Sequence, residues 1–297
     1  MNDPYRPPAE MSLVDGFSDD VPTAAMQGAS PHILALKILR KHFFVLLLCS
    51  LAIWLPLNLA LSYLDQYFVD EDDLRTSLRM QQLFSWWFGI LSTGAILSAV
   101  AGAYRGQTPT WGRSMAAGVR CWPRLWTTYF LYWTIGAFGL IAFIFPGIYF
   151  WVRAVYCDAI AVNEAVHGPT AVQRSFQITK GRFGDTFVVA LVITGVYLVS
   201  AIAFTAILVA IVLLADPSFV ESPSWYWIVE AFVVSLFSIA TVYAQTFVFC
   251  WYQRMRIQLG AIANQASGHA GGTDPLLDQL PDDMGQSPDP PREPMRW

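Results

Sequence analysis

The chain has 297 residues, of which 55% are hydrophobic and only 13% are charged, and its formal net charge is −4. Soluble domains are about 25% charged, so this composition argues against a soluble enzyme or a disordered regulator. Residues 1–30 and 257–297 hold 3 basic and 11 acidic residues, a net charge of −8, whereas residues 31–256 have a net charge of +4. We therefore predict an apolar membrane domain at 31–256 between two acidic, disordered cytoplasmic tails, the first of them rich in proline.

Six apolar segments of the middle region are long enough to cross a bilayer, which takes about 20 residues per helix. In chain order they are 43–64, 84–104, 126–145, 148–166, 187–214 and 225–252. Pro146 and Gly147 separate the third segment from the fourth. Proline lacks a backbone donor and glycine tolerates left-handed dihedrals, so we predict a tight turn there. The predicted fold is all-α, a polytopic membrane protein with six transmembrane helices.

Lysine and arginine alternate between the segments that connect these six helices. The segments on one side hold 3, 4, 3 and 2 basic residues, and those on the other side hold 2, 0 and 0. Short cytoplasmic loops retain positive charge. We therefore expect a multi-pass protein of the bacterial cytoplasmic (inner) membrane with both termini in the cytoplasm.

The segments before the three pairs of spans resemble one another. Residues 109–129 and 169–187 share Pro-Thr, then Arg-Ser, then an arginine four residues before a threonine, and residues 31–43 form a looser copy. This predicts three parallel helical hairpins, each preceded by an amphipathic basic helix on the cytoplasmic side. The alternative is that short cytoplasmic loops are commonly arginine-rich and helical.

The basic residues of these amphipathic helices are candidate ligands for anionic lipid headgroups, because such helices lie in the headgroup layer. They are Arg113, Arg120, Arg124, Arg174, Lys180 and Arg182. The alternative role is topology control and anchoring alone. We expect Glu164 to reach the same interface, within range of Arg174 or Arg182, and to pin the second of these helices.

Ionisable residues inside membrane spans are costly and often functional. Arg153 and Glu230 lie at similar predicted depth on different spans, so we expect an ion pair between them inside the bundle. Asn58 has a similar depth and is expected near the pair. The pair is interpreted as structural, and the alternative is that it lines a substrate path.

Asp158 lies near the predicted membrane midplane, with no basic partner at its depth. Three states are open for it: a protonated acid, an acid bonded to hydroxyls such as those of Ser235 or Ser238, or an acid facing a wet cavity. It is the first residue to test for ion or proton transfer.

The order of residues between 145 and 187 resembles a widespread bacterial membrane family related to the membrane domain of glycerophosphoryl diester phosphodiesterases. The residues that carry the resemblance are Pro146, Gly147, Ile148, Tyr149, Val152, Arg153, Glu164, Gly168, Ala171, Arg174, Ser175, Lys180, Gly181 and Arg182. The resemblance implies a membrane architecture. It does not imply phosphodiesterase activity, because the two tails leave no room for the family's metal-dependent barrel. Asp158 is a departure from the family's pattern.

The sequence contains no motif that indicates catalysis or a cofactor. The four cysteines are far apart, the four histidines lie outside the predicted spans, and no nucleophile–base or metal-ligand spacing occurs. We therefore predict that the protein is not an enzyme, with no catalytic residues, metal or cofactor.

The sequence favours a non-enzymatic membrane module that interacts with lipid, with another membrane protein or with a second copy of itself, and not with nucleic acid. The alternative is a transporter or channel for an ion or small molecule that uses Arg153, Asp158 and Glu230. A water-accessible cavity reaching Asp158 favours the transporter, whereas a bundle sealed by aromatic side chains favours the module.

Overall fold

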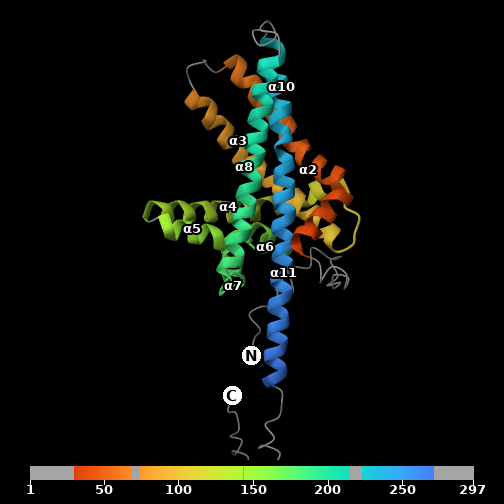
Figure 1. Ribbon diagram of the computed structural model, residues 1–297, viewed down its shortest axis with the longest axis vertical. Helices are drawn as coiled ribbons and strands as arrows, with labels where there is room; N and C mark the ends of the chain where they lie inside the picture. Colours follow the sequence, from red (N-terminus) through yellow and green to blue (C-terminus); the bar gives the residue numbers. More distant parts are fainter. Residues whose placement is uncertain (1–29, 69–73, 143, 215–222, 271–297) are drawn as a thin grey trace, which may run out of the picture. The chain divides into compact units, whose positions relative to one another are not determined.

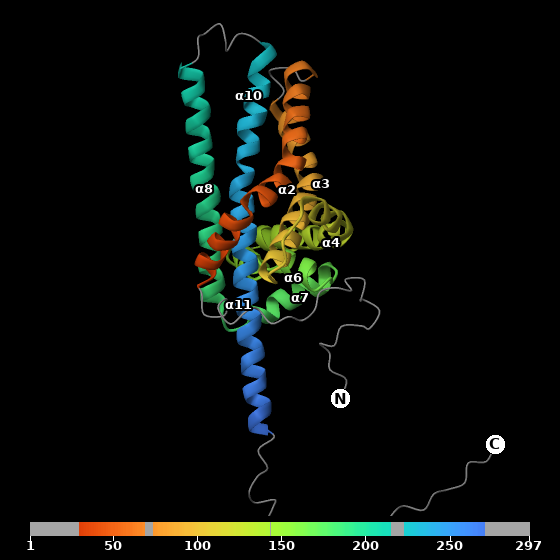
Figure 2. The same ribbon diagram turned by 90° about the vertical axis from the view of Figure 1, so that its right-hand side faces the viewer.

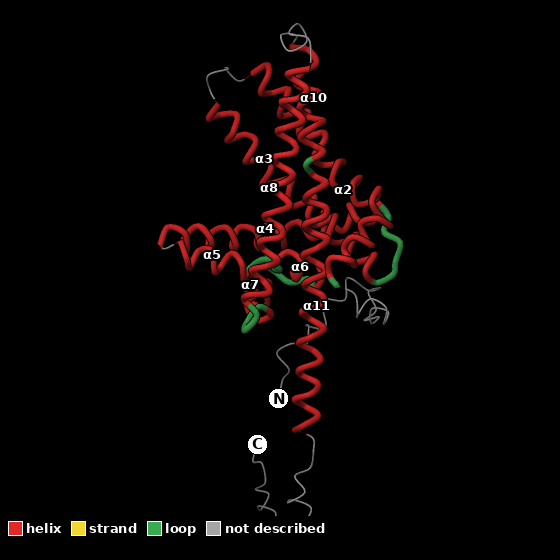
Figure 3. The backbone as a smooth tube through the Cα atoms, viewed as in Figure 1, coloured by secondary structure: helices red, strands yellow, loops and turns green. Residues whose placement is uncertain are grey.

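The computed structural model describes residues 30–68, 74–142, 144–214 and 223–270 (Figure 1). Their helices are α2 (Pro31–Phe68), α3 (Leu74–Tyr104), α4 (Trp111–Ala142), α5 (Ile144–Arg153), α6 (Cys157–Asn163), α7 (Gly168–Ile178), α8 (Phe183–Leu214), α10 (Pro223–Leu236) and α11 (Ser238–Ala270). These described residues form helices and loops without a strand, so the predicted all-α class is confirmed (Figure 3). Contacts divide the chain after Arg256, and the cavity described below belongs to the unit that ends there. The predicted tails lie outside the described residues except for Ser30 and residues 257–270, and the latter are the helical end of α11 instead of the predicted disordered chain.

Five described segments are long and apolar enough to cross a membrane, as expected for a multi-pass membrane protein. They are Pro31–Phe68, Gln82–Tyr104, Ile144–Asn163, Phe183–Ile207 and Trp227–Leu259. The segment in α8 has the highest mean hydropathy, 2.5, and only 6% of it is buried. A helix that is apolar on all sides and exposed is suited to contact with lipid. The predicted third span, 126–145, falls mostly in α4, which is not one of the five.

The tight turn predicted at Pro146 and Gly147 is wrong. Helix α4 ends at Ala142, α5 begins at Ile144, and both residues lie inside α5. Pro146 is tolerated because it occupies the first helical turn, where a backbone N–H has no intrahelical acceptor. Gly147 allows α5 to approach α4 closely, since a Cβ there would lie 2.7 Å from the backbone nitrogen of Leu140. The α4–α5 pair crosses the direction of α8 instead of running along it (Figure 1).

The fourth predicted span, 148–166, is not one continuous helix. A turn at residues 154–156 separates α5 from α6. The amide of Ala154 donates to the carbonyl of Trp151 at 3.2 Å, and the amide of Cys157 donates to the carbonyl of Ala154 at 3.0 Å. Hydrogen bonds between residues i and i+3 are typical of a tight turn. Asp158 therefore lies in the first turn of the new helix.

The three predicted basic helices differ in their local structure. Helix α7 is separate from α8 and has Pro169 in its first turn, as predicted. The first copy is the start of α2, which bends at His42, where φ is −119° and ψ is 21° (Figure 2). The copy at 109–129 runs without interruption through α4, with Pro123 inside the helix. The three predicted entry helices therefore differ, and the described residues do not confirm an arrangement of three parallel helical hairpins.

The core lies where α3, α6 and α11 meet. Fully buried side chains there include Ile96, Val100, Ile160 and Phe249. Small residues bring α3 and α4 together, since a Cβ on Gly118 would lie 2.8 Å from the backbone nitrogen of Ala95. This core holds the first turn of α6, and with it Asp158, in place.

Candidate functional site

A cavity of about 730 Å³ opens beside this core. Its walls come from α2, α3, α4, the segment 154–158, α8 and α11. Ligand pockets in proteins commonly have volumes of about 300–1,000 Å³. The cavity is thus large enough for a small molecule, and helices from both halves of the chain build it.

Asp158 faces this cavity. No described residue donates a hydrogen bond to its carboxylate or forms a salt bridge with it. The phenols of Tyr129, Tyr132 and Tyr197 line the same cavity. Ser235 and Ser238, the hydroxyl partners considered from the sequence, are not among the lining residues. Of the three states open for Asp158, the bond to Ser235 or Ser238 does not occur, and the protonated acid and the acid facing a cavity both fit this geometry.

Aromatic rings form much of the cavity wall around Asp158. Trp86 stacks on Trp133 with ring centroids 5.9 Å apart and meets Tyr129 edge-on at 6.3 Å. Trp54 lines the cavity from α2, and its indole nitrogen has no hydrogen-bond partner among the described residues. These rings present large polarisable surfaces to whatever occupies the cavity.

The remaining polar lining is neutral. Thr93 comes from α3, and Thr241 and Gln245 come from α11. The described lining contains no lysine, arginine or histidine, so Asp158 is the one formally charged side chain among the described lining residues. Within that lining, hydroxyl, amide and carboxylate groups converge on one hollow without a positive partner.

No family model, curated protein or solved structure matches this chain.

The predicted ion pair between Arg153 and Glu230 is wrong. Arg153 ends α5 and turns toward α7, where Nε donates to Thr179 Oγ1 at 3.1 Å and Nη2 donates to the carbonyl of Phe176. Its Nη1 donates to Tyr149 Oη at 2.9 Å. Counting residues gives equal depth only on helices that run parallel to one another, whereas α5 belongs to the α4–α5 pair that crosses the direction of α8 (Figure 1). Neither Arg153 nor Glu230 lines the cavity.

Glu164 pins α7, as predicted, and its partner is Arg174. Arg174 Nη1 contacts Glu164 Oε2, and the two side chains are only 25% and 14% exposed. Tyr252 of α11 donates to Glu164 Oε1 at 2.6 Å. Asn163 donates to the same tyrosine at 3.3 Å and accepts from Arg105 at 2.9 Å. This Glu164 network joins α3, α6, α7 and α11.

Asn58 is buried, but its partner is not the one predicted. Its amide donates to the hydroxyl of Ser235 in α10 at 3.1 Å. That hydroxyl in turn donates to the carbonyl of Ala231 at 2.7 Å. Asn58 therefore ties α2 to α10 and does not reach Arg153.

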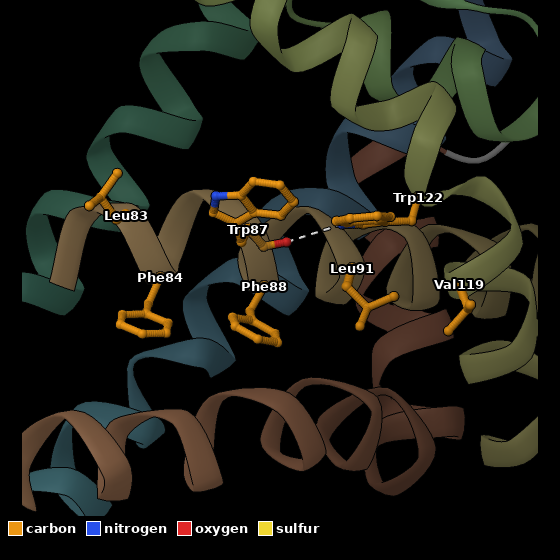
Figure 4. Close-up of a pocket in the computed structure, with 7 residues that line it drawn as sticks. All are labelled: Leu83, Phe84, Trp87, Phe88, Leu91, Val119 and Trp122. Carbon is orange, nitrogen blue, oxygen red and sulfur yellow. Dashed lines mark hydrogen bonds between the residues drawn. The ribbon is translucent and has the colours of Figure 1, made fainter. Parts of the chain in front are cut away.

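A second hollow, of about 630 Å³, lies between α3 and the first half of α4 (Figure 4). We call it the α3–α4 groove. The indole of Trp122 donates to the carbonyl of Trp87 at 3.1 Å and holds one wall. All of its lining side chains are apolar or aromatic: Leu83, Phe84, Trp87, Phe88, Leu91, Val119 and Trp122. The groove has the chemistry of a hydrocarbon binding site.

The six predicted headgroup ligands divide into two groups. Arg113, Arg120 and Lys180 are exposed. Arg124, Arg174 and Arg182 are half-buried, and Arg182 donates to the sulfur of Met255 at 3.4 Å. The exposed ones remain available to an external anion, whereas Arg174 belongs to the Glu164 network.

The described residues contain no group of three histidine, cysteine or acidic side chains that would hold a metal. Burial raises the pKa of the Cys121 thiol, although Arg124 and Arg120 lower it. The thiol therefore forms a nucleophilic thiolate less readily than a free cysteine does.

Sequence reasoning identified Asp158 but missed the residues around it. A signal was present, because Leu125, Tyr129, Tyr132 and Trp133 recur on one face of α4. Thr241 and Gln245 follow the same helical spacing on α11. Nothing in the sequence indicates that these two faces meet across one cavity.

Proposed function

We propose that the protein is an integral membrane protein that binds a small solute in the Asp158 cavity, as a transporter or channel does. The observation that carries this proposal is an acid that has no partner among the described residues and faces a hollow large enough for a ligand. Ionisable groups inside membrane proteins are costly and commonly mark substrate or ion pathways. A bundle that served only as an interaction module would gain stability by filling this space with apolar side chains.

The proposed solute site differs from the one predicted from the sequence. The proposed site includes Asp158 but not Arg153 or Glu230, because their side chains lie outside the cavity. It also includes Tyr132, Tyr197 and Thr241, which the sequence did not indicate. The chemistry proposed is binding and passage of a solute without a covalent step.

We place the protein in the bacterial cytoplasmic membrane with both termini in the cytoplasm, as the lysine and arginine distribution predicts. The α4–α5 pair returns to the side from which it starts, whether or not it reaches the far face of the membrane. The number of full crossings is therefore even in either case, and the two termini lie on the same side.

A second candidate function is binding of an anionic lipid, supported by the α3–α4 groove. Val119 lines this groove, and the next residue, Arg120, is exposed together with Arg113 on the same helix. An acyl chain in the groove would bring a lipid headgroup near these arginines. Native mass spectrometry in mild detergent tests it: an anionic lipid retained by the native chain is lost from Arg113→Gln/Arg120→Gln. Lipid retention that is equal in both proteins contradicts this second function.

The solute-binding proposal is tested by chemical access to the cavity. In a chain whose four cysteines are replaced by alanine, Thr241→Cys places a thiol in the cavity, and Thr246→Cys places one in the buried core of the same helix. The neutral reagent 2-hydroxyethyl methanethiosulfonate is added, and the intact mass of each protein is followed with time. We expect Thr241→Cys to react at least about tenfold faster, because opening the packed core requires local unfolding. Equal reaction rates for the two variants would show that Thr241 does not face an accessible cavity, and would contradict the proposed function.

A further inference from the structure

The charge of the Asp158 cavity restricts what it can hold. Among the lining residues that the structure describes, Asp158 carries the one formal charge. A buried carboxylate without a counter-charge is strongly unfavourable, so the site gains either a proton or a cation. An anionic solute would add a second negative charge and is disfavoured. The sign of the charge therefore selects a cationic occupant.

The walls of the cavity select the kind of cation. The faces of tryptophan and tyrosine rings attract cations through their negative quadrupole, and cages of such rings hold alkylammonium groups. Trp54, Trp86, Trp133 and Tyr132 supply such rings, and Tyr197 brings another from α8. A metal cation has less to gain from these walls, because hard cations take six or more oxygen ligands at about 2.0–2.6 Å.

The volume leads to the same class of ligand. A space of about 730 Å³ is far larger than a bare metal ion needs. The described residues also lack a cluster of three potential metal ligands, and the described lining of the cavity holds no second acid and no histidine. An organic group that carries one positive charge and several alkyl carbons would use the acid, the rings and the space together.

We propose that the Asp158 cavity binds an organic ammonium cation, with the charged nitrogen facing Asp158 and its alkyl groups against the tryptophan and tyrosine rings. This inference rests on the proposed solute-binding function and names the class of its ligand. Thr241 and Gln245 are placed to accept or donate hydrogen bonds to a polar substituent of the cation.

The charge requirement is tested with a matched pair of probes. Choline and its neutral carbon isostere, 3,3-dimethylbutan-1-ol, have the same shape and differ by one charge. Binding of each to the purified full-length chain in non-ionic detergent is measured by saturation-transfer NMR. We expect choline to bind about tenfold more tightly or better, because attraction to an unpaired, partly desolvated carboxylate is added for choline alone. The Asp158→Asn variant should bind choline more weakly than the native chain and should keep only the smaller preference for choline that the rings supply.

The aromatic contribution is tested at Tyr197. Tyr197→Phe keeps the ring face and removes the hydroxyl, whereas Tyr197→Leu removes both. A cation held on the ring should bind to the phenylalanine variant nearly as to the native chain and about threefold or more weakly to the leucine variant. Equal losses in both variants would show that the hydroxyl is the ligand, which contradicts a ring-bound ammonium group.

Three results would overturn the inference. Equal binding of choline and its isostere, or binding of neither, would contradict a cationic ligand. Displacement of choline by an equal concentration of Na⁺ would assign the site to an inorganic ion. Unchanged choline binding by Asp158→Asn would show that choline binds at a site other than the Asp158 cavity. Reaction at Thr241→Cys would still support a solute cavity in each case, so failure of the ligand class and failure of the function are distinguishable.

Discussion

Asp158 and Glu164 lie at the two ends of the seven-residue helix α6, and their surroundings are opposite. Glu164 is held by Arg174 and Tyr252, which themselves anchor α7 and α11. Asp158 faces a cavity of about 730 Å³ and receives no hydrogen bond from a described residue. Glu164 therefore has hydrogen-bond and charge partners, whereas Asp158, at the other end of the same short helix, has none among the described residues.

The contrast shows how position within a fold separates structural from functional acids. An acid whose oxygens are all bonded stabilises the fold, and its loss leaves a charged partner unpaired. An acid without a protein partner costs stability unless a proton or ligand completes it. We therefore assign Glu164 to structure and Asp158 to binding, and the following changes test that division.

The largest loss of stability is expected for Arg174→Ala. It leaves the half-buried Glu164 without its cation, and we expect the free energy of unfolding to fall by about 3 kcal/mol, at the low end for buried ion pairs. Thermal unfolding in detergent measures this loss. Arg113→Ala, which removes an exposed arginine, is the control and should change stability little. Equal effects of the two variants would show that the Glu164 network carries no stability.

Arg153→Ala is expected to cost about 2 kcal/mol, because it removes charge-assisted hydrogen bonds to Thr179 and to the carbonyl of Phe176. The exchange Arg153→Glu/Glu230→Arg sharpens the test. Since Arg153 bonds to α7 and not to Glu230, the double variant should be no more stable than its less stable single variant. Recovery of native thermal stability in the double variant would show that residues 153 and 230 do pair, as the sequence predicts, and would contradict the structure.

Tyr252→Phe removes the hydroxyl that donates to Glu164 and accepts from Asn163. We expect a loss of about 1 kcal/mol, since each net hydrogen bond contributes about 0.5–1.5 kcal/mol. Tyr243→Phe on the same helix, where the ring stacks on Phe247, is the matched control and should be nearly neutral. A larger loss of stability in Tyr243→Phe than in Tyr252→Phe would show that the Tyr252 hydroxyl is not the stabilising polar group of α11.

The smallest effect is expected at Ala165, directly after Glu164, whose φ of 54° lies in the left-handed region. Ala165→Gly should raise stability by about 0.5–1 kcal/mol, because glycine adopts this conformation without steric strain. Ala116→Gly, in an exposed helical position of α4, should lower stability by about as much. Two changes of the same sign would show that the turn at Ala165 is not strained.

Features that depend on nearby residues were predictable from the sequence. The Glu164–Arg174 contact joins residues separated by one short loop, and α7 follows from Pro169 and its helical periodicity. The all-helical class follows from composition. The pairing of Arg153 with Glu230 failed because residue counts give equal depth only on parallel helices, whereas α5, which ends at Arg153, belongs to the pair that crosses the direction of α8 (Figure 1).

The Asp158 cavity was only half predictable. The acid stands out as an ionisable residue in an apolar segment, yet Trp54 and Gln245, on opposite walls, come from distant parts of the chain. Which faces of α2, α4 and α11 surround Asp158 depends on how the α4–α5 pair crosses α8 (Figure 1). That crossing is set by tertiary contacts such as the close approach at Gly147, which composition and periodicity do not encode.

The division between the two acids of α6 is tested most directly by one pair of variants, Asp158→Asn and Glu164→Gln, compared for thermal unfolding in detergent without added solute. Both changes replace an acid by its neutral isostere. The account predicts that Asp158→Asn unfolds at the native temperature or above it, because an uncompensated carboxylate is removed. It predicts that Glu164→Gln unfolds clearly below, because Arg174 loses its counter-charge. A fall for Asp158→Asn as large as that for Glu164→Gln would contradict the assignment of Asp158 to solute binding.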